Sequence, residues 1–214
     1  MTTVAVIAKA CLPGRVKTRL SPPLTLEEAA LIAAASLADT LDLVRSLPDC
    51  RRVLFFDGDP ALAPAEAAGF ELLPQPQTGG LDERLGYLFD TYDDTLVLLG
   101  MDTPQVRPST LAPIFEDRDP GVDAWYGAAA DGGWWTLALR RPTGDMLRGV
   151  PMSEPHTGRE QLRRLRSAGL RIEMLPTLVD IDTIEDAERV APLIPHSRLA
   201  MTLSAIGVQR VGVA

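Results

Sequence analysis

Short apolar runs alternate with longer amphipathic segments along the first half of the chain. Four of these runs are predicted as strands, and they cover residues 3–8, 52–56, 70–73 and 95–99. Their apolar positions are continuous rather than alternating, which is typical of strands buried on both faces of a parallel sheet. Between them, the spacing of apolar residues predicts helices at 26–44, 61–68 and 81–92.

The first of these helices has clear signals at its start and along one face. Thr25 is placed to cap its amino terminus, and Glu28 occupies the third helical position, as in a capping box. Apolar residues then recur every three or four positions and predict one buried stripe. They are Leu26, Ala30, Ala33, Leu37, Leu41 and Val44.

The second half of the chain is less regular. Two β-like runs flank a turn-forming sequence at 130–133, and they cover 124–129 and 134–139. A further strand is predicted at 170–175, and helices at 158–168 and 184–193. This alternation indicates an α/β fold with a Rossmann-like, mostly parallel central sheet and helices on both faces. We expect a single domain at 1–195, followed by a tail at 196–214 whose mixed periodicity assigns it to no element.

Charge and composition exclude several classes of function. The 214 residues carry a net charge of −8, which argues against general binding to nucleic acid or to anionic membranes. An anionic substrate would therefore need a local basic patch or a metal ion. Cys11 and Cys50 provide neither a disulfide framework nor the ligand spacing of a zinc site. No stretch is long enough to span a bilayer, so we expect a soluble cytoplasmic protein with no membrane or nucleic-acid partner.

A basic loop follows the first predicted strand. Ligands of open α/β sheets bind beyond the carboxyl ends of the strands, so this position favours a binding role. Lys9, Arg15, Lys17 and Arg19 reverse the sign of the overall charge locally and could pair with phosphate oxygens, while Gly14 permits a close approach of the backbone. The spacing of a Walker A loop is missing, and a solvated basic loop is the alternative interpretation.

Carboxylates follow the fourth predicted strand and recur late in the chain. Asp102 is well placed to hold Mg²⁺ or Mn²⁺, which prefer oxygen ligands and bridge to phosphates; its alternative role is a turn residue bonded to its own backbone. Asp180 and Asp182 alternate along a strand-like stretch, so they point the same way and could complete a metal site. In the alternative interpretation, Asp182 caps the next helix with Glu185 as its capping-box partner.

A third acidic motif precedes two tryptophans. Asp131 is followed by two glycines, which suggest a tight turn or a close backbone approach to a ligand. Asp131 is a candidate catalytic base or acceptor-orienting residue. The alternative is a hairpin turn with core tryptophans, which we favour for Trp135.

These motifs, in this order, resemble those of a bacterial glycosyltransferase-like family associated with arsenosugar and selenium-related gene clusters. The matching segments are PGRVKTRL at 13–20, GMDTP at 100–104, DGGWW at 131–135 and DIDT at 180–183. The resemblance covers residues 1 to about 195. The family belongs to the GT-A superfamily of nucleotide-sugar glycosyltransferases and sugar nucleotidyltransferases, and its relatives include 2-phospho-L-lactate guanylyltransferase and the molybdenum-cofactor nucleotidyltransferases. Met101 and the tryptophan pair depart from its pattern, where a small polar residue and two tyrosines are expected.

The resemblance implies a GT-A fold and roles for individual residues. Its phosphate-binding residues would be Arg15, Lys17 and Arg19. Its metal ligands would be Asp102, Asp180 and Asp182. The stretch 75–84 would face the base or the substrate, and with it Gly79, Gly80 and Arg84.

Together these features favour a transferase that depends on Mg²⁺ or Mn²⁺. Our leading hypothesis is a glycosyltransferase that moves a sugar from a nucleotide-sugar to a small-molecule acceptor, with Asp102 and the metal stabilising the departing nucleoside diphosphate. The alternative is a nucleotidyltransferase that joins an NTP to a phosphorylated small molecule and releases pyrophosphate, with Lys17 contacting the triphosphate. A non-catalytic nucleotide-binding protein is the third hypothesis, and a homodimer is a candidate assembly.

Overall fold

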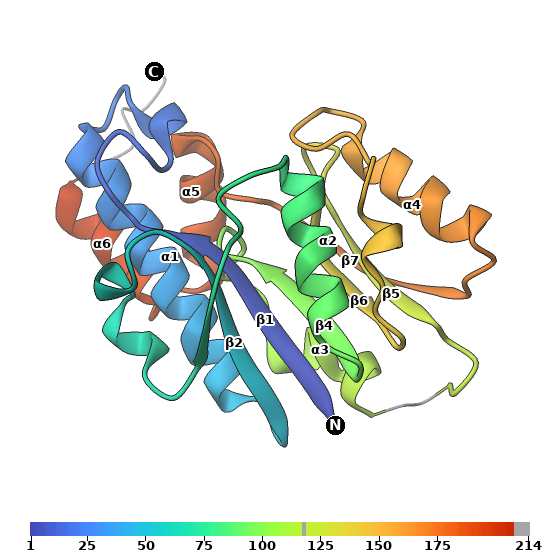
Figure 1. Cartoon of the computed structure of the whole chain (residues 1–214). Helices are drawn as coiled ribbons and strands as arrows, with labels where there is room; N and C mark the ends of the chain where they lie inside the picture. Colours follow the sequence, from blue (N-terminus) through green and yellow to red (C-terminus); the bar gives the residue numbers. More distant parts are fainter. Residues whose placement is uncertain (117–118, 208–214) are drawn as a thin grey trace.

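Within residues 1–116 and 119–207, which the computed structural model describes, seven strands form one sheet in the order β3-β2-β1-β4-β6-β5-β7 (Figure 1). The strands are β1 (Thr2–Lys9), β2 (Cys50–Asp57), β3 (Glu71–Pro74), β4 (Thr95–Gly100), β5 (Ala124–Ala129), β6 (Trp134–Leu139) and β7 (Ile172–Leu178). Only β6 is antiparallel to its neighbours, β4 and β5; the other pairs are parallel. The predicted Rossmann-like, mostly parallel sheet is thereby confirmed.

Helices cover both faces of this sheet, and they bury both sides of its central strands β1 and β4. α1 (Leu26–Ser46) and α3 (Pro108–Phe115) pack on the face that includes Val4 and Val6, whereas α2 (Leu81–Thr91) and α4 (Thr157–Ser167) pack on the face that includes Ala5 (Figure 1). A third apolar cluster joins α1 to α5 (Ile184–Val190) and α6 (Arg198–Ile206). The predicted capping box of α1 is present, since Thr25 Oγ1 accepts from the Glu28 amide and the Glu28 carboxylate accepts from the Thr25 amide.

Two segments differ from the sequence-based expectations because of proline. The helix predicted at 61–68 is instead a pair of 3₁₀ turns, η2 (Pro60–Leu62) and η3 (Ala65–Ala67). Pro64 separates them, and its lack of an amide hydrogen and its clash with the preceding turn would interrupt a continuous helix there. Helix α3 was not predicted, since Pro108 begins it and Pro113 lies inside it.

The tail that the sequence left unassigned contributes a helix to the fold. Asp39, on α1, accepts hydrogen bonds from the backbone amides of Arg198 and Leu199, both at 2.9 Å, and so caps the start of α6. The Arg198 guanidinium also pairs with Asp42. The domain therefore continues beyond residue 195, and residues 208–214 lie outside the described part of the chain.

The described residues form neither a membrane-spanning helix nor a disulfide bond. In the described residues, none of the helices has the length and apolar character needed to cross a membrane. Cys11 and Cys50 are free thiols. Burial, with a smaller contribution from Asp102, raises the pKa of the Cys11 thiol to about 11, which leaves little thiolate at neutral pH.

Candidate active site

The strand directions bring all the predicted motifs to one edge of the sheet. β1 and β4 are parallel, so the basic loop and Asp102 follow their carboxyl ends together. β6 is antiparallel to β4, which places the turn between β5 and β6 at the same edge. β7 runs parallel to β5 and ends just before Asp180. A cavity of about 690 Å³ opens at this edge.

Both signs of charge line the cavity. Its basic residues are Lys9, Lys17 and Arg19. Its acidic residues are Asp102, Asp131, Glu154, Asp180 and Asp182. Apolar side chains complete the lining, among them Leu81 and Leu85 of α2, Trp134, and Met152.

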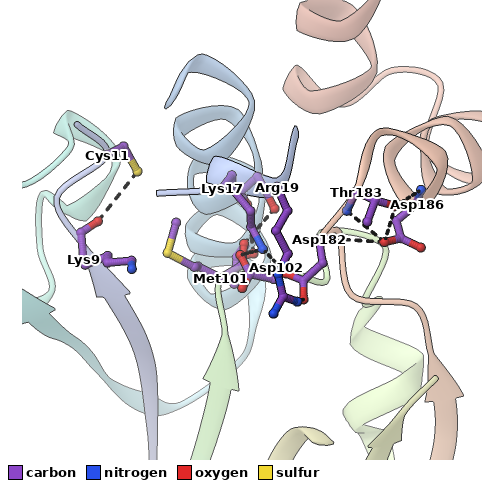
Figure 2. A network of polar contacts seen from close by, with 11 residues as sticks. Lys9, Cys11, Lys17, Arg19, Met101, Asp102, Asp182, Thr183 and Asp186 are labelled. Atoms are coloured by element: carbon purple, nitrogen blue, oxygen red, sulfur yellow. Dashed lines mark hydrogen bonds and ion pairs between the residues drawn. The ribbon is translucent and has the colours of Figure 1, made fainter. Parts of the chain in front are cut away.

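Lys17 lies at the centre of the charged cluster (Figure 2). Its ammonium nitrogen is 2.9 Å from Asp102 Oδ1 and 2.9 Å from Asp182 Oδ1, and its side chain is only 9% exposed. It donates a hydrogen bond to Asp182. Burial lowers the pKa of Lys17, but the attraction of the two carboxylates outweighs burial and raises it, so the side chain stays charged. The Lys17 backbone is left-handed, with φ of 47°, an uncommon conformation for a residue other than glycine.

Backbone hydrogen bonds hold Asp102 next to the segment that carries the other carboxylates. The Ile181 amide donates to the Asp102 carbonyl at 2.9 Å, and Gln105 Nε2 donates to the Val179 carbonyl at 2.7 Å. The buried Ser36 hydroxyl of α1 donates to the Met101 carbonyl at 2.7 Å. The position of Asp102 is thus fixed from two sides.

The interpretation of Asp182 as a helix cap is wrong. Thr183 caps α5, with Asp186 as its capping-box partner, so the box lies one residue later than the sequence interpretation placed it. The Asp182 carboxylate is consequently available to Lys17 and to Arg19, whose Nη1 lies 3.4 Å from Asp182 Oδ2. The alternative in which Asp182 faces the site is the one that the geometry supports.

Asp180 is the least compensated of the acidic groups. Its Oδ1 is buried and accepts no hydrogen bond within the described residues. Burial, and after it the negative charges of Asp102 and Asp131, raises the pKa of Asp180 to about 7. Asp102 Oδ1 is likewise buried, and the Lys17 ammonium lies 2.9 Å from it.

The predicted metal ligands have suitable chemistry, but the side chains are not arranged as a metal site. Among the described residues, no three His, Cys, Asp or Glu side chains gather closely enough to hold an ion. Carboxylate oxygens are nevertheless the ligands that Mg²⁺ and Mn²⁺ prefer, and two buried oxygens, on Asp102 and Asp180, lack a hydrogen-bond donor. Metal binding by Asp102, Asp180 and Asp182 remains a prediction.

Asp131 combines a turn role with a place at the cavity. Its Oδ1 accepts a hydrogen bond from the Gly133 amide at 2.8 Å, as the hairpin interpretation expects. Its side chain also lines the cavity, as does that of Trp134. Trp135 is buried in the core, as expected, and its indole donates to the Pro176 carbonyl.

The loop at 151–156 and the first turn of α4 pack directly on this turn. The Gly158 amide donates to the Gly132 carbonyl at 2.8 Å, and the Tyr126 hydroxyl donates to the Gly158 carbonyl at 3.1 Å. A Cβ atom on Gly132 would lie 2.1 Å from the Pro155 carbonyl oxygen, so only glycine fits there. Glu154 and Met152, from the same loop, line the cavity.

The remaining predicted phosphate-binding residues lie outside the cavity lining. Arg15 and Gly14 are exposed on the loop between Cys11 and Lys17. Gly79 and Gly80 precede α2. Arg84 donates to Gln75 Oε1 at 3.1 Å and pairs with Asp57 at 3.6 Å, beside the carboxyl end of β2.

Several lining residues were not predicted from the sequence. Leu81 and Leu85 carry the helical spacing of core residues, and only the position of α2 over the end of β1 exposes them to the cavity. Glu154 lies in a loop without a recognisable signature. Ser36 does not line the cavity but supports it through the Met101 carbonyl, and it offered a signal, since it is a polar residue within an apolar helical stripe.

A family model matches residues 40–154, more than half of the chain, and its family is described as "uncharacterized protein conserved in bacteria" (DUF2064). The chain belongs to the DUF2064 family. The matched region includes Asp102, Asp131 and Glu154, whereas the basic loop precedes it. No curated protein matches the sequence of this DUF2064 member.

Solved structures place this DUF2064 member in a known fold. A protein from Desulfovibrio desulfuricans G20, provisionally described as a nucleotide-diphospho-sugar transferase, has a TM-score of 0.82 and 24% identity over 96% of each chain. CMP:2-keto-3-deoxy-manno-octonic acid synthetase in complex with CTP has a TM-score of 0.59 and 15% identity over 91% of this chain and 98% of its own. A cytidylyltransferase from Leptospira borgpetersenii serovar Hardjo-bovis (strain JB197) has a TM-score of 0.56 and 15% identity over 99% and 98%. At these identities the comparison establishes the shared fold, which confirms the predicted α/β fold class.

Proposed function

We propose that this protein is a metal-dependent glycosyltransferase that moves a sugar from a nucleotide-sugar to a small-molecule acceptor. The observation that carries the proposal is the cluster of Lys17, Asp102 and Asp182 at the carboxyl ends of β1 and β4. In open α/β sheets this edge is where nucleotides bind. The cavity of about 690 Å³ is large enough for a donor and a small acceptor.

The charge balance of the cavity supports a role for a metal. Five carboxylates face three basic side chains, so a diphosphate alone would meet net repulsion. Asp102, with Asp180 or Asp182, would hold Mg²⁺ or Mn²⁺. When bound, the ion would neutralise phosphate charge and stabilise the departing nucleoside diphosphate.

The chain's own residues divide between the two substrates. Lys17, Lys9 and Arg19 project into the cavity from β1 and the following loop, and they are the groups available to pair with donor phosphates. Asp131 lies on the opposite side, at the turn between β5 and β6. Because one of its oxygens accepts from Gly133, the carboxylate is oriented, and it is our candidate to position the acceptor hydroxyl and accept its proton.

Nucleotidyl transfer is the second candidate, and the placement of Lys17 favours it. Lys17 is nearly buried on the loop after β1, with Arg19 on the same loop and Lys9 at the end of the strand, and this set suits a triphosphate at least as well as a diphosphate. The shared fold with a synthetase that binds CTP is compatible with this reaction. The two reactions release different products, nucleoside diphosphate or pyrophosphate.

The decisive experiment screens donors and then identifies the product. Thermal shifts with NTPs and nucleotide-sugars, with and without Mn²⁺, should identify a donor that stabilises the folded protein. Turnover of that donor with acceptor pools should release nucleoside diphosphate for glycosyl transfer or pyrophosphate for nucleotidyl transfer. D102N should lower turnover about 100-fold or more, because it removes a negative ligand from the site.

D93N is the matched control. Asp93 is exposed just before β4, at the opposite end of that strand from Asp102, so turnover should not change. Binding without turnover, with no response to D102N, would instead identify a non-catalytic nucleotide-binding protein.

A further inference from the structure

The Lys17 ammonium makes close contacts with two of the three predicted metal ligands (Figure 2). We propose that this ammonium and a divalent cation compete for Asp102 and Asp182, so that the metal enters the site efficiently only as a complex with a diphosphate, which gives Lys17 a new partner. The proposal rests on the proposed function for the identity of the diphosphate. Its central claim, the competition, concerns only this chain and the metal.

The position of the Lys17 ammonium between the two carboxylates leads to competition with a metal ion. Lys17 Nζ lies 2.9 Å from one carboxylate oxygen of each aspartate, and its side chain is 9% exposed, so it occupies the space between them. A divalent cation would bind these oxygens at about 2.0 to 2.2 Å. It would then stand within a few ångströms of the ammonium, where two positive charges repel strongly at the low effective dielectric of a protein site. Both cations cannot hold these oxygens together.

The two carboxylates differ in their other basic neighbours. Lys17 Nζ lies 2.9 Å from an oxygen of each, and Asp102 Oδ1 is buried. Asp182 has a second basic neighbour, since Arg19 Nη1 lies 3.4 Å from its Oδ2. Loss of Lys17 would therefore leave Asp182 partly compensated but Asp102 without its only cation in the described residues. Asp102 is the group that gains most from a metal.

Lys17 can also reach the donor phosphates from its present backbone position. Thr18 and Arg19, which follow it, line the same cavity, and so does Lys17 itself. The residue holds a left-handed conformation, with φ of 47° and ψ of 37°, at the start of the turn η1 (Thr18–Leu20). Such a conformation is unfavourable for a side-chain-bearing residue and is maintained where its placement matters. The flexible four-carbon chain can then turn from carboxylate to phosphate.

Reciprocal coupling follows from this arrangement. A ligand that draws Lys17 away raises metal affinity, and the metal raises affinity for that ligand by the same factor. Couplings of this kind are typically about 5- to 150-fold. The contacts of Lys17 thereby disfavour binding of the free metal and favour binding of the metal together with its diphosphate.

The test measures metal affinity directly. Mn²⁺ binding is titrated by electron paramagnetic resonance in wild type, K17M, K17R and R141M. K17M removes the competing charge and should bind free Mn²⁺ about tenfold more tightly than wild type, with a larger thermal stabilisation by Mn²⁺. K17R retains the charge and should show no gain. R141M is the control: Arg141 is exposed just beyond the end of β6, at the edge of the sheet opposite the cavity, so its affinity should stay within about twofold.

In a second titration, the change in affinity caused by K17M should have the opposite sign. The preformed Mn²⁺–pyrophosphate complex, followed by calorimetry, should bind K17M about tenfold more weakly than wild type, because the phosphate partner is lost. Equal or weaker binding of free Mn²⁺ by K17M, or no Mn²⁺ binding by any variant, would overturn the competition. Neither titration requires turnover, so the competition can fail while transfer is demonstrated, and a failed search for turnover leaves this result intact.

Discussion

The two walls of the cavity are built by different forces. The charged wall comprises Lys17, Asp102 and Asp182, which come from three separate loops and meet through ion pairs. The turn wall comprises the β5–β6 turn at 130–133 and the segment at 151–158, a loop and the first turn of α4, which meet through backbone hydrogen bonds and glycine contacts. One wall is shaped by charge and the other by steric fit.

We therefore expect the charged wall to bind ligands and the turn wall to keep its shape. Side chains that are held by charge can exchange partners when a ligand brings a new charge, whereas a packed backbone has a single arrangement. We therefore expect the charged wall to respond to metal, pH and ligand. The turn wall should respond to added volume and should hold Asp131 and Glu154 in place throughout.

The largest expected effect is steric and falls on the turn wall. G132A should destabilise the protein by about 4 kcal/mol, because its Cβ would lie 2.1 Å from the Pro155 carbonyl oxygen and its φ of +95° is unfavourable for alanine. Denaturant unfolding measures this. G69A is the matched control: its φ is +85°, and no atom lies within 4 Å of the added Cβ. It should lose only about 1 kcal/mol, and equal losses in the two variants would contradict the steric origin of the turn wall.

The next largest effect is electrostatic, and it is the pH dependence of stability that Asp180 causes. The pKa of Asp180 is raised from 3.8 to about 7, chiefly by burial and then by Asp102 and Asp131. The folded protein therefore holds this proton more tightly than the unfolded chain. That contribution to stability is complete below about pH 4 and is lost as the pH rises through about 7. D180N is permanently neutral and should avoid this loss.

Denaturant unfolding in EDTA at several pH values tests this prediction. D180N should match wild type near pH 4 and exceed it by about 2 kcal/mol at pH 8, roughly half of what the full shift would give, because the side chain is only partly removed from water. Other carboxylates titrate in both proteins, so the difference between the two is the quantity to follow. A difference that does not change with pH would show that Asp180 is not the uncompensated charge of the site.

Sequence patterns predicted the strands and the convergence of motifs better than they predicted contacts. The apolar runs of β1 and β4 are unambiguous, and their shared direction places the basic loop beside Asp102. The insertion of the antiparallel β6 between β4 and β5 has no local signal, because strand order depends on long-range pairing. Proline accounts for the two errors at η2–η3 and α3.

Within the candidate site, residue types were predictable and partners were not. The sequence indicated Lys17, Asp102, Asp131, Asp180 and Asp182 as site residues, and all line one cavity. It could not show that Lys17 pairs with Asp102 and Asp182, since these residues are far apart in the chain. The cap of α5 was misplaced by one residue, because Asp182 and Thr183 are both good capping residues and only the backbone distinguishes them.

The smallest expected effect concerns the caps of α1 and α5, and it distinguishes a loss of stability from a loss of ligand binding. T25A and T183A each remove a capping hydroxyl that accepts from the third helical amide, so each should lose about 1 kcal/mol of stability. Thr25 begins α1 away from the ion pairs, whereas Thr183 directly follows Asp182. Its capping partner Asp186 also accepts from the Asp182 amide, at 3.3 Å. T183A should therefore also weaken binding of the Mn²⁺–pyrophosphate complex, by about threefold, while T25A should leave it unchanged. Unequal binding at equal stability would show that the start of α5 positions the charged wall; equal binding would mean that the ion pairs to Lys17 and Arg19 suffice to place Asp182.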